Sequence, residues 1–224
     1  MSTIDDAVRW PTPPVVRALD VAAKVFLVWL LAVALVYPEI GNMEDKAAGA
    51  RAVAYPLLAF TVPFIWWYRW RERASFPWVA DLLVTATCFT DTLGNRMDLY
   101  DRIVWFDDWM HFMNTGVLTG AVILLTKQHA ATVMETLERG VAFGVTAAVA
   151  WEIAEYFAFI STSPERMSAY ADTLGDIALG GLGAITAALC VHWCWRQGWL
   201  HTAAPQLAGL DRSDRALPVL PARE

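Results

Sequence analysis

The stretch that decides the fold is Trp151-Glu152-Ile153-Ala154-Glu155-Tyr156, which places two glutamates inside the apolar run 140–160. A helix of about 21 residues spans the roughly 30 Å hydrocarbon core of a bilayer, so the run reads as a membrane span. Glu152 and Glu155 are three residues apart and project from the same helix face. An acidic side chain at that depth costs about 2.5–3.5 kcal/mol on insertion scales, so both glutamates need partners.

The composition is that of a helical membrane protein. Of the 224 residues, 57% are hydrophobic and 12 are Trp, which is too apolar for an ordinary soluble domain of this size. The 17 Lys and Arg are scattered, so no nucleic-acid-binding patch is expected. The three cysteines lie in apolar segments and predict no disulfide framework. The fold class predicted is an all-α, polytopic transmembrane bundle in contact with the lipid bilayer.

Hydropathy predicts about six spans, at 21–37, 52–68, 78–92, 109–126, 140–160 and 172–195. We expect a cytoplasmic segment at 1–20, a transmembrane domain at 21–200 and a disordered cytoplasmic tail at 201–224. The first twenty residues lack the basic start and short apolar core of a cleaved signal peptide, so the first span is expected to be retained.

The distribution of basic residues predicts the orientation of the bundle. The N-terminus, the tail and the connections on their side carry eleven Lys and Arg, whereas the alternate connections carry five. Both termini are therefore expected to face the cytoplasm across a bacterial plasma membrane.

Small residues recur at four-residue spacing in the last three predicted spans. They are Gly116 with Gly120, Gly140 with Gly144, and Gly180 with Ala184 and Ala188. Such spacing lets helix backbones approach closely, so these spans are expected to form one tight bundle.

The predicted topology brings acidic residues from three spans to one depth. Asp107 and His111 share a face at the outer entry of the fourth span, and Asp172 and Asp176 do the same in the sixth. Glu152 lies about 12 residues, or roughly 18 Å, above the inner end of the fifth span. The carboxylates and one imidazole therefore converge in the outer half of the bundle.

So many like charges cannot all remain ionised without compensation. The compensating group is Arg96, Arg102 or Arg166 from the outer loops, bound protons, or a divalent metal ion. Carboxylate oxygens with one histidine suit Zn²⁺, Mn²⁺, Mg²⁺ or Fe²⁺, and the ligands of one or two ions are predicted to be Asp107, His111, Glu152, Glu155, Asp172 and Asp176. Metal identity stays open, because no tight zinc-binding motif is present.

Several acidic residues also have simpler interpretations. Asp172 is equally well explained as the N-cap of the sixth span, and Asp108 as a solvated residue at the membrane interface. Asp81 is expected to reach the inner interface or Arg73. Asp91 and Asn95 are expected on the outer side of the membrane. They are candidates to position the ligand side chains without binding the ion themselves.

The order Asp107-x-x-x-His111-Phe112, Trp151-Glu152-x-x-Glu155, and Asp172-Thr173-x-x-Asp176 followed by Gly180, Gly183 and Ala184 resembles the YjdF family of bacterial inner-membrane proteins. A more distant resemblance is to the VanZ-like family. Both resemblances cover about residues 75–195. They imply a multi-span plasma-membrane protein and specify no reaction.

The leading hypothesis is a metal-dependent hydrolase acting on a lipid or lipid-linked substrate from the outer leaflet, with Glu152 or Glu155 as general base. One alternative is a proton- or cation-coupled transporter that uses the same acids. Another is a structural or accessory membrane protein. Whether the chain is an enzyme, and its oligomeric state, are not specified by the sequence.

Overall fold

A computed structural model describes residues 11–37, 39, 47–72, 74–127, 129–158, 160–162, 164–167, 169–201 and 203. Its regular elements are helices, in agreement with the predicted fold class. The longer ones are α1 (Pro14–Val36), α3 (Ala48–Ala59), α5 (Trp78–Arg96), α7 (Phe106–Thr126), α8 (Val133–Ala158) and α9 (Ala169–Arg196). Shorter ones are α4 (Thr61–Ile65), a π-helical segment (Trp66–Trp70), α6 (Leu99–Arg102) and two 3₁₀ turns (Ile160–Thr162 and Pro164–Met167).

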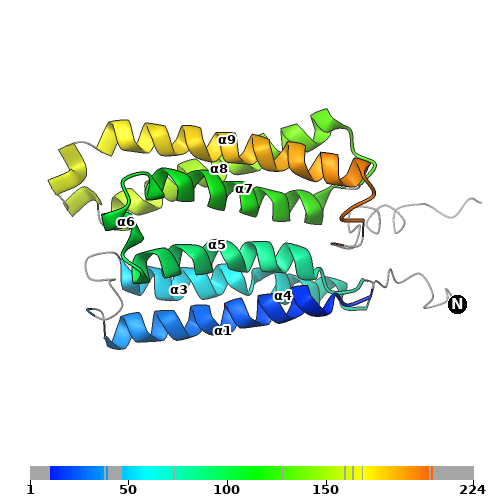
Figure 1. The fold of residues 1–224 in the computed structure, drawn as a ribbon, viewed down its shortest axis with the longest axis horizontal. Helices are drawn as coiled ribbons and strands as arrows, with labels where there is room; N and C mark the ends of the chain where they lie inside the picture. Colours follow the sequence, from blue (N-terminus) through cyan, green and yellow to red (C-terminus); the bar gives the residue numbers. More distant parts are fainter. Residues whose placement is uncertain are drawn as a thin grey trace, which may run out of the picture.

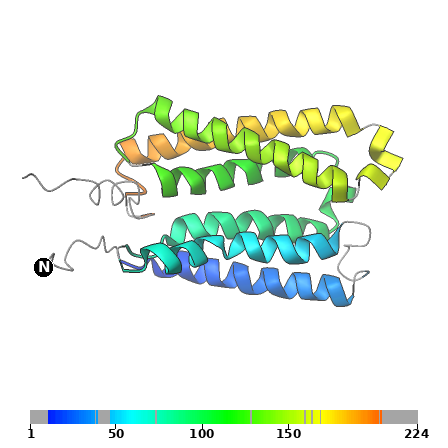
Figure 2. The ribbon, with the colours of Figure 1, turned by 180° about the vertical axis from the view of Figure 1, so that it is seen from behind.

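The long helices form two layers (Figures 1 and 2). Helices α1, α3 and α5 make one layer, and α7, α8 and α9 make the other, with α5 packing on α7 between them. Helix α6 links the layers at one end of the bundle, which we call the α6 end. The start of α1 and the end of α9 both lie at the opposite end, which we call the terminal end.

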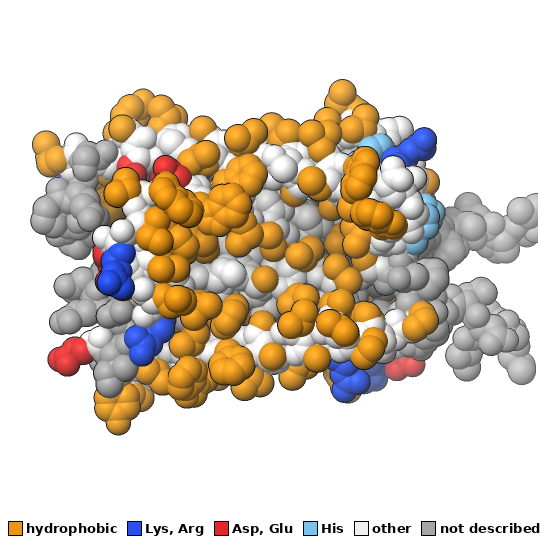
Figure 3. Space-filling view, in the orientation of Figure 1, with side chains coloured by type: hydrophobic (Ala, Val, Ile, Leu, Met, Phe, Trp, Pro, Cys, Tyr) orange, Lys and Arg blue, Asp and Glu red, His pale blue; other side chains and the backbone are white. Residues whose placement is uncertain are grey.

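Hydrophobic side chains cover the middle of the bundle, and charged side chains gather toward its two ends (Figure 3). Four helices are long and apolar enough to cross a membrane, namely α1, α7, α8 and α9. Their bounds agree with the predicted spans to within several residues. The largest extensions are at the starts of α1 and α8. At the start of α8, Thr132 and Glu135 form a capping box, with the Thr132 amide donating to Glu135 at 2.8 Å.

The second and third predicted spans are less regular. Helix α3 is followed by a second part, 61–70, made of α4 and the π-helical segment. These two parts pass the test of length and hydropathy only when taken together, and they are bent by 42° relative to each other. Proline at position 56 lies inside α3, where its ring removes a backbone donor and favours a break. Helix α5 is not among the four candidates, because Asp81, Asp91 and four threonines lower its hydropathy.

Small residues hold α7, α8 and α9 close together, as the four-residue spacing predicts. A Cβ atom on Gly183 of α9 would lie 2.0 Å from the carbonyl oxygen of Phe112 in α7, and one on Gly144 of α8 would lie 2.2 Å from the Cβ of Ala184. The backbones of α7 and α9 therefore touch directly, next to the turn that carries His111.

Replacing Gly183 by alanine is expected to destabilise the protein by about 1–3 kcal/mol, because the new methyl group meets rigid backbone. Gly175 is the matched control in the same helix, since its added Cβ has no neighbour within 4 Å among the described residues. Gly175→Ala should be neutral or slightly stabilising, as alanine favours a helix over glycine. Chemical unfolding in detergent measures both, and equal stability of the two variants would contradict the close contact.

A buried ion cluster joins α1 to α5, and it corrects the expectation for Asp81. The Nζ atom of Lys24 lies 2.7 Å from Oδ1 of Asp20 and 2.9 Å from Oδ2 of Asp81. Asp81 is 1% exposed, so it does not reach the interface. Arg73, its other expected partner, lies outside the described residues. The expectation of a position at the interface was wrong, because Lys24 of another helix binds this carboxylate inside the bundle.

Candidate metal centre

The first turns of α7 carry Asp107 and His111 on one face, as their spacing predicts. Oδ1 of Asp107 lies 3.4 Å from Nε2 of His111. The His111 side chain is 9% exposed, whereas that of Asp107 is 44% exposed. The imidazole therefore points into the bundle, and the aspartate stays near its surface at the α6 end.

Helices α8 and α9 bring two further carboxylates to the same imidazole. Oε1 of Glu152 lies 3.4 Å from Nδ1 of His111, and Oδ1 of Asp176 lies 3.8 Å from Nε2. Glu152 is 7% exposed and Asp176 is 3% exposed. Each ring nitrogen thus faces a buried carboxylate from a different helix.

Five residues form what we call the acid–histidine cluster: Asp107, His111, Glu152, Glu155 and Asp176. Ligand atoms of Asp107, His111 and Asp176 lie within 4.8 Å of one another, and so do those of His111, Glu152 and Glu155. His111 belongs to both groups. One carboxylate-rich site with an imidazole nitrogen has the donor set that suits divalent first-row metals and Mg²⁺.

One oxygen atom of Glu152 requires a further binding partner. Its Oε1 is buried and has no hydrogen-bond partner among the described residues. Leaving a buried acceptor unpaired costs free energy, so such an atom calls for a bound proton, water or cation. Its 3.4 Å distance to Nδ1 of His111 is compatible with a shared ion, because two ligands about 2.0–2.2 Å from a tetrahedral ion lie roughly 3.4 Å apart.

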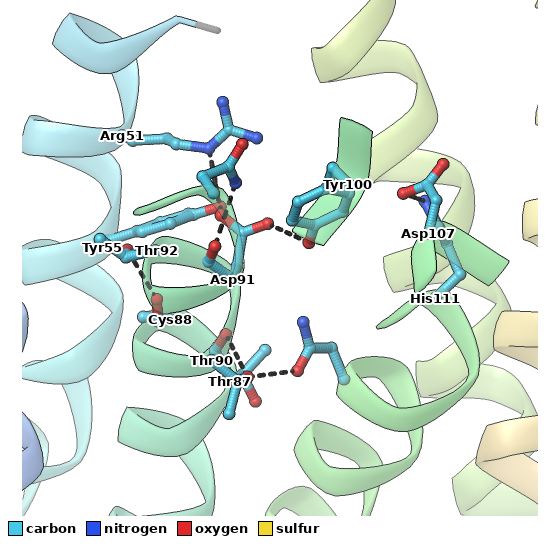
Figure 4. A network of polar contacts seen from close by, with 12 residues as sticks. Arg51, Tyr55, Thr87, Cys88, Thr90, Asp91, Thr92, Tyr100, Asp107 and His111 are labelled. Carbon is cyan, nitrogen blue, oxygen red and sulfur yellow. Dashed lines mark hydrogen bonds and ion pairs between the residues drawn. The ribbon is translucent and has the colours of Figure 1, made fainter. Parts of the chain in front are cut away.

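A second polar network lies beside the cluster at the α6 end (Figure 4). Asp91 of α5 accepts hydrogen bonds from the hydroxyls of Tyr55, at 2.6 Å, and Tyr100, at 2.7 Å. Its Oδ2 also lies 3.1 Å from Nε of Arg51. We call these residues the Asp91 network. The ring of Tyr55 stacks on Trp151 with centroids 6.3 Å apart, so the network contacts α8 next to Glu152.

Tyr100, the member of this network on α6, lies between Asp91 and Asp107 (Figure 4). Burial and the neighbouring Asp91 carboxylate raise the pKa of its hydroxyl well above the usual range. Tyr100 therefore keeps its proton at neutral pH and acts as a donor to Asp91. This hydrogen bond ties the short connection between the layers to α5.

The comparison with protein families agrees with this architecture. Over residues 23–197, the sequence matches the family described as predicted membrane proteins, DUF2238, which is the family of YjdF. The chain belongs to this family. No curated protein and no solved structure matches it. The resemblance to YjdF seen in the acidic motifs is thereby confirmed, and this DUF2238 chain is a membrane protein.

In this DUF2238 chain, five of the six predicted ligands lie together in the acid–histidine cluster. The sixth, Asp172, lies in the first turn of α9, is exposed, and is not part of either group of ligand atoms. Its role as a ligand stays a prediction. The N-cap alternative for Asp172 is wrong, because α9 begins at Ala169 and places the residue inside the helix. Asp108 is exposed, as expected.

A cation other than the three arginines expected from the loops lies in the Asp91 network beside the cluster. Of the three loop arginines, Arg102 pairs with Asp98, four residues before it, with 3.9 Å between Nε and Oδ2. Arg51, which precedes the second predicted span at 52–68, instead lies in the first turn of α3 and reaches Asp91. The sequence signal for this pairing was Arg51 and Tyr55 at four-residue spacing, which places both on one helix face.

Proposed function

We propose that this DUF2238 chain is a metal-dependent membrane hydrolase that acts on a lipid or lipid-linked substrate. The observation that carries the proposal is His111, whose two ring nitrogens each face a buried carboxylate while Oε1 of Glu152 accepts no hydrogen bond from the part of the chain that the structure describes. A buried group of acids with one imidazole is the environment in which a divalent cation replaces the missing positive charge.

One ion binds one nitrogen of an imidazole, so the two ligand groups define two positions. We place the principal ion on the Nδ1 side, with Glu152 and Glu155, because the unpaired oxygen lies there. Asp107 and Asp176 on the Nε2 side then orient the ring, as carboxylates commonly do for metal-bound histidines, or hold a second ion. Zn²⁺, Mn²⁺, Mg²⁺ and Fe²⁺ all suit this donor set.

A divalent ion in this position supplies an acidified water that serves as a nucleophile near neutral pH. Glu155 is less buried than Glu152 and shares its helix face, so it is placed to accept the proton of that water. Glu152 is the better candidate for a ligand. Nucleophilic catalysis by Ser or Cys is not proposed, since no such side chain belongs to the cluster.

The proposed membrane arrangement follows from the bundle. The four apolar helices and the bent pair of α3 and α4 account for up to five spans, and we propose the polar helix α5 as the sixth. We place the terminal end on the cytoplasmic side of a bacterial plasma membrane, because the basic residues are concentrated there. The acid–histidine cluster then lies at the level of the outer leaflet, where the headgroups of lipid substrates lie.

Elemental analysis of the purified protein tests the proposal. Wild type is expected to carry near-stoichiometric divalent metal, Glu152→Gln to lose it, and Asp176→Asn to bind it roughly 10- to 100-fold more weakly. Asp108→Asn, at an exposed neighbouring position, is the matched control and should keep the ion. The ion that copurifies is then used in hydrolysis assays with phosphatidylglycerol and phosphatidylethanolamine vesicles.

Absence of metal from monodisperse wild type, even after incubation with each of the four cations, would exclude the metalloenzyme. If the protein binds metal but releases no phosphate or fatty acid from the vesicles, the metal site is supported and these phospholipids are excluded as substrates.

A further inference from the structure

The Lys24 cluster, made of Asp20, Lys24, Asp81 and Thr85, is a second charged site inside the bundle. It lies between α1 and α5, and all four residues are buried. Asp81 comes three residues after the start of α5, and Asp20 six residues after the start of α1, so the cluster lies roughly 5–9 Å from the terminal end of these helices. The acid–histidine cluster lies at the other end and uses other helices.

The charges of the Lys24 cluster do not balance if every group is ionised. Asp20 and Asp81 contribute two negative charges, and Lys24 contributes one positive charge. Thr85 is neutral, with its hydroxyl 3.0 Å from Oδ1 of Asp20. Lys24 also donates to this hydroxyl. One negative charge is therefore left over in a buried site, which is strongly unfavourable inside a membrane.

No further cation of the described residues fills this gap. Arg17 is exposed and lies over the ring of Trp78, with 5.6 Å from its Cζ to the ring centroid. On the side of α3 and α4, the neighbour of Lys24 is the ring of Phe60, 5.9 Å from Nζ. Cys88, the next titratable group along α5, is a buried thiol.

Two observations indicate where the missing positive charge belongs. Oδ1 of Asp81 has no hydrogen-bond partner among the described residues. Water cannot readily supply one, because Asp81 is only 1% exposed. In addition, Oδ1 of Asp20 and Oδ2 of Asp81 lie 2.7 and 2.9 Å from the same Nζ atom of Lys24, so the two carboxyl groups lie beside one another. Two neighbouring carboxyl groups can share a hydrogen bond only if one of them holds a proton.

We propose that Asp20 and Asp81 form a proton-binding pair, which holds one proton while Lys24 remains charged. The bound proton makes the Lys24 cluster neutral and supplies the hydrogen that the two carboxyl groups share. Because the two carboxyl groups share the proton, it belongs to the pair and not to either residue alone. Because the pair lies near the terminal end, it exchanges its proton with the aqueous phase on that side.

This proton site does not depend on the proposed metal chemistry. It lies in the half of the bundle that faces the terminal end, where the helices of the acid–histidine cluster are largely apolar. An exchangeable proton in that half is a feature that a proton-coupled transporter requires. The site therefore gives the transport hypothesis a specific pair of residues.

Infrared spectroscopy of the full-length protein in nanodiscs at neutral pH tests the proposal. A protonated carboxyl gives a C=O stretching band that is separate from the carboxylate bands. We expect this band in wild type, and we expect it to be lost in Asp81→Asn and Asp20→Asn. Glu152→Gln should leave this component of the band unchanged, which separates the pair from the acid–histidine cluster. An identical band in all four proteins, or no band in wild type, would overturn the proposal.

Thermal unfolding supplies a second and independent test. Asparagine resembles a protonated aspartate and leaves one carboxylate for Lys24, so Asp81→Asn should keep a melting temperature close to that of wild type. Lys24→Met leaves two carboxylates without a cation and should lower the melting temperature strongly. If Asp81→Asn lowers it as much as Lys24→Met, both aspartates are ionised and the proposal is wrong.

Discussion

Replacing His111 by alanine is expected to remove the metal ion completely and to lower any metal-dependent hydrolysis by more than about 100-fold. His111 belongs to both groups of ligand atoms, whereas each carboxylate belongs to one. Loss of a residue that only orients a ligand already costs roughly 10- to 100-fold in affinity or activity, and loss of the shared ligand must cost more. Isothermal titration with the copurifying ion measures the affinity.

The control for this variant is His129→Ala. His129 is exposed in the connection between α7 and α8, away from the α6 end, so its loss should leave the ion content unchanged. His111→Gln, which keeps a polar side chain in place, guards against a folding defect. Full ion content in a monodisperse His111→Gln or His111→Ala protein would place the metal elsewhere.

Replacing Asp91 by alanine is expected to destabilise the protein by about 3–5 kcal/mol, because it leaves the mostly buried guanidinium of Arg51 without its carboxylate. The same change removes the acceptor of the Tyr55 and Tyr100 hydroxyls. Chemical unfolding in detergent, followed by circular dichroism, measures the loss.

Two comparisons sharpen the Asp91 experiment. Asp98→Asn is the control, since this partly exposed residue has a positive φ of 60° that asparagine tolerates, and its pair with Arg102 is long, at 3.9 Å. Replacing Arg51 and Asp91 together by Met and Leu should cost less than Asp91→Ala alone, because the buried guanidinium is then removed together with its Asp91 carboxylate. A double variant that is less stable than Asp91→Ala would contradict this account.

The arrangement of the acid–histidine cluster was largely predictable, because it follows from local spacing and from depth. Asp107 with His111, and Glu152 with Glu155, share helix faces at fixed intervals. The alternation of successive predicted spans then gave the relative direction of the helices, which places these faces at one end. Neither step requires knowledge of how the helices pack.

The partners of Lys24 and Arg51 were not predictable in the same way. Both residues find carboxylates on α5, 57 and 40 positions further along the chain. Hydropathy places the first span at 21–37, which leaves Asp20 outside it, although α1 begins at Pro14. Charged residues lower the hydropathy of a helix end, so the pairs that stabilise these helices also concealed their true bounds.

The division of the bundle into two layers has a consequence for the order in which the chain is synthesised. Lys24 and Arg51 each bind an aspartate of α5, so these contacts of α1 and α3 can form once residue 96 has left the ribosome. The first layer can therefore assemble in the bilayer before α7 is made. The acid–histidine cluster is complete only when α9 follows. Loading of the proposed metal ion is then a late event, which occurs after insertion of the last helix.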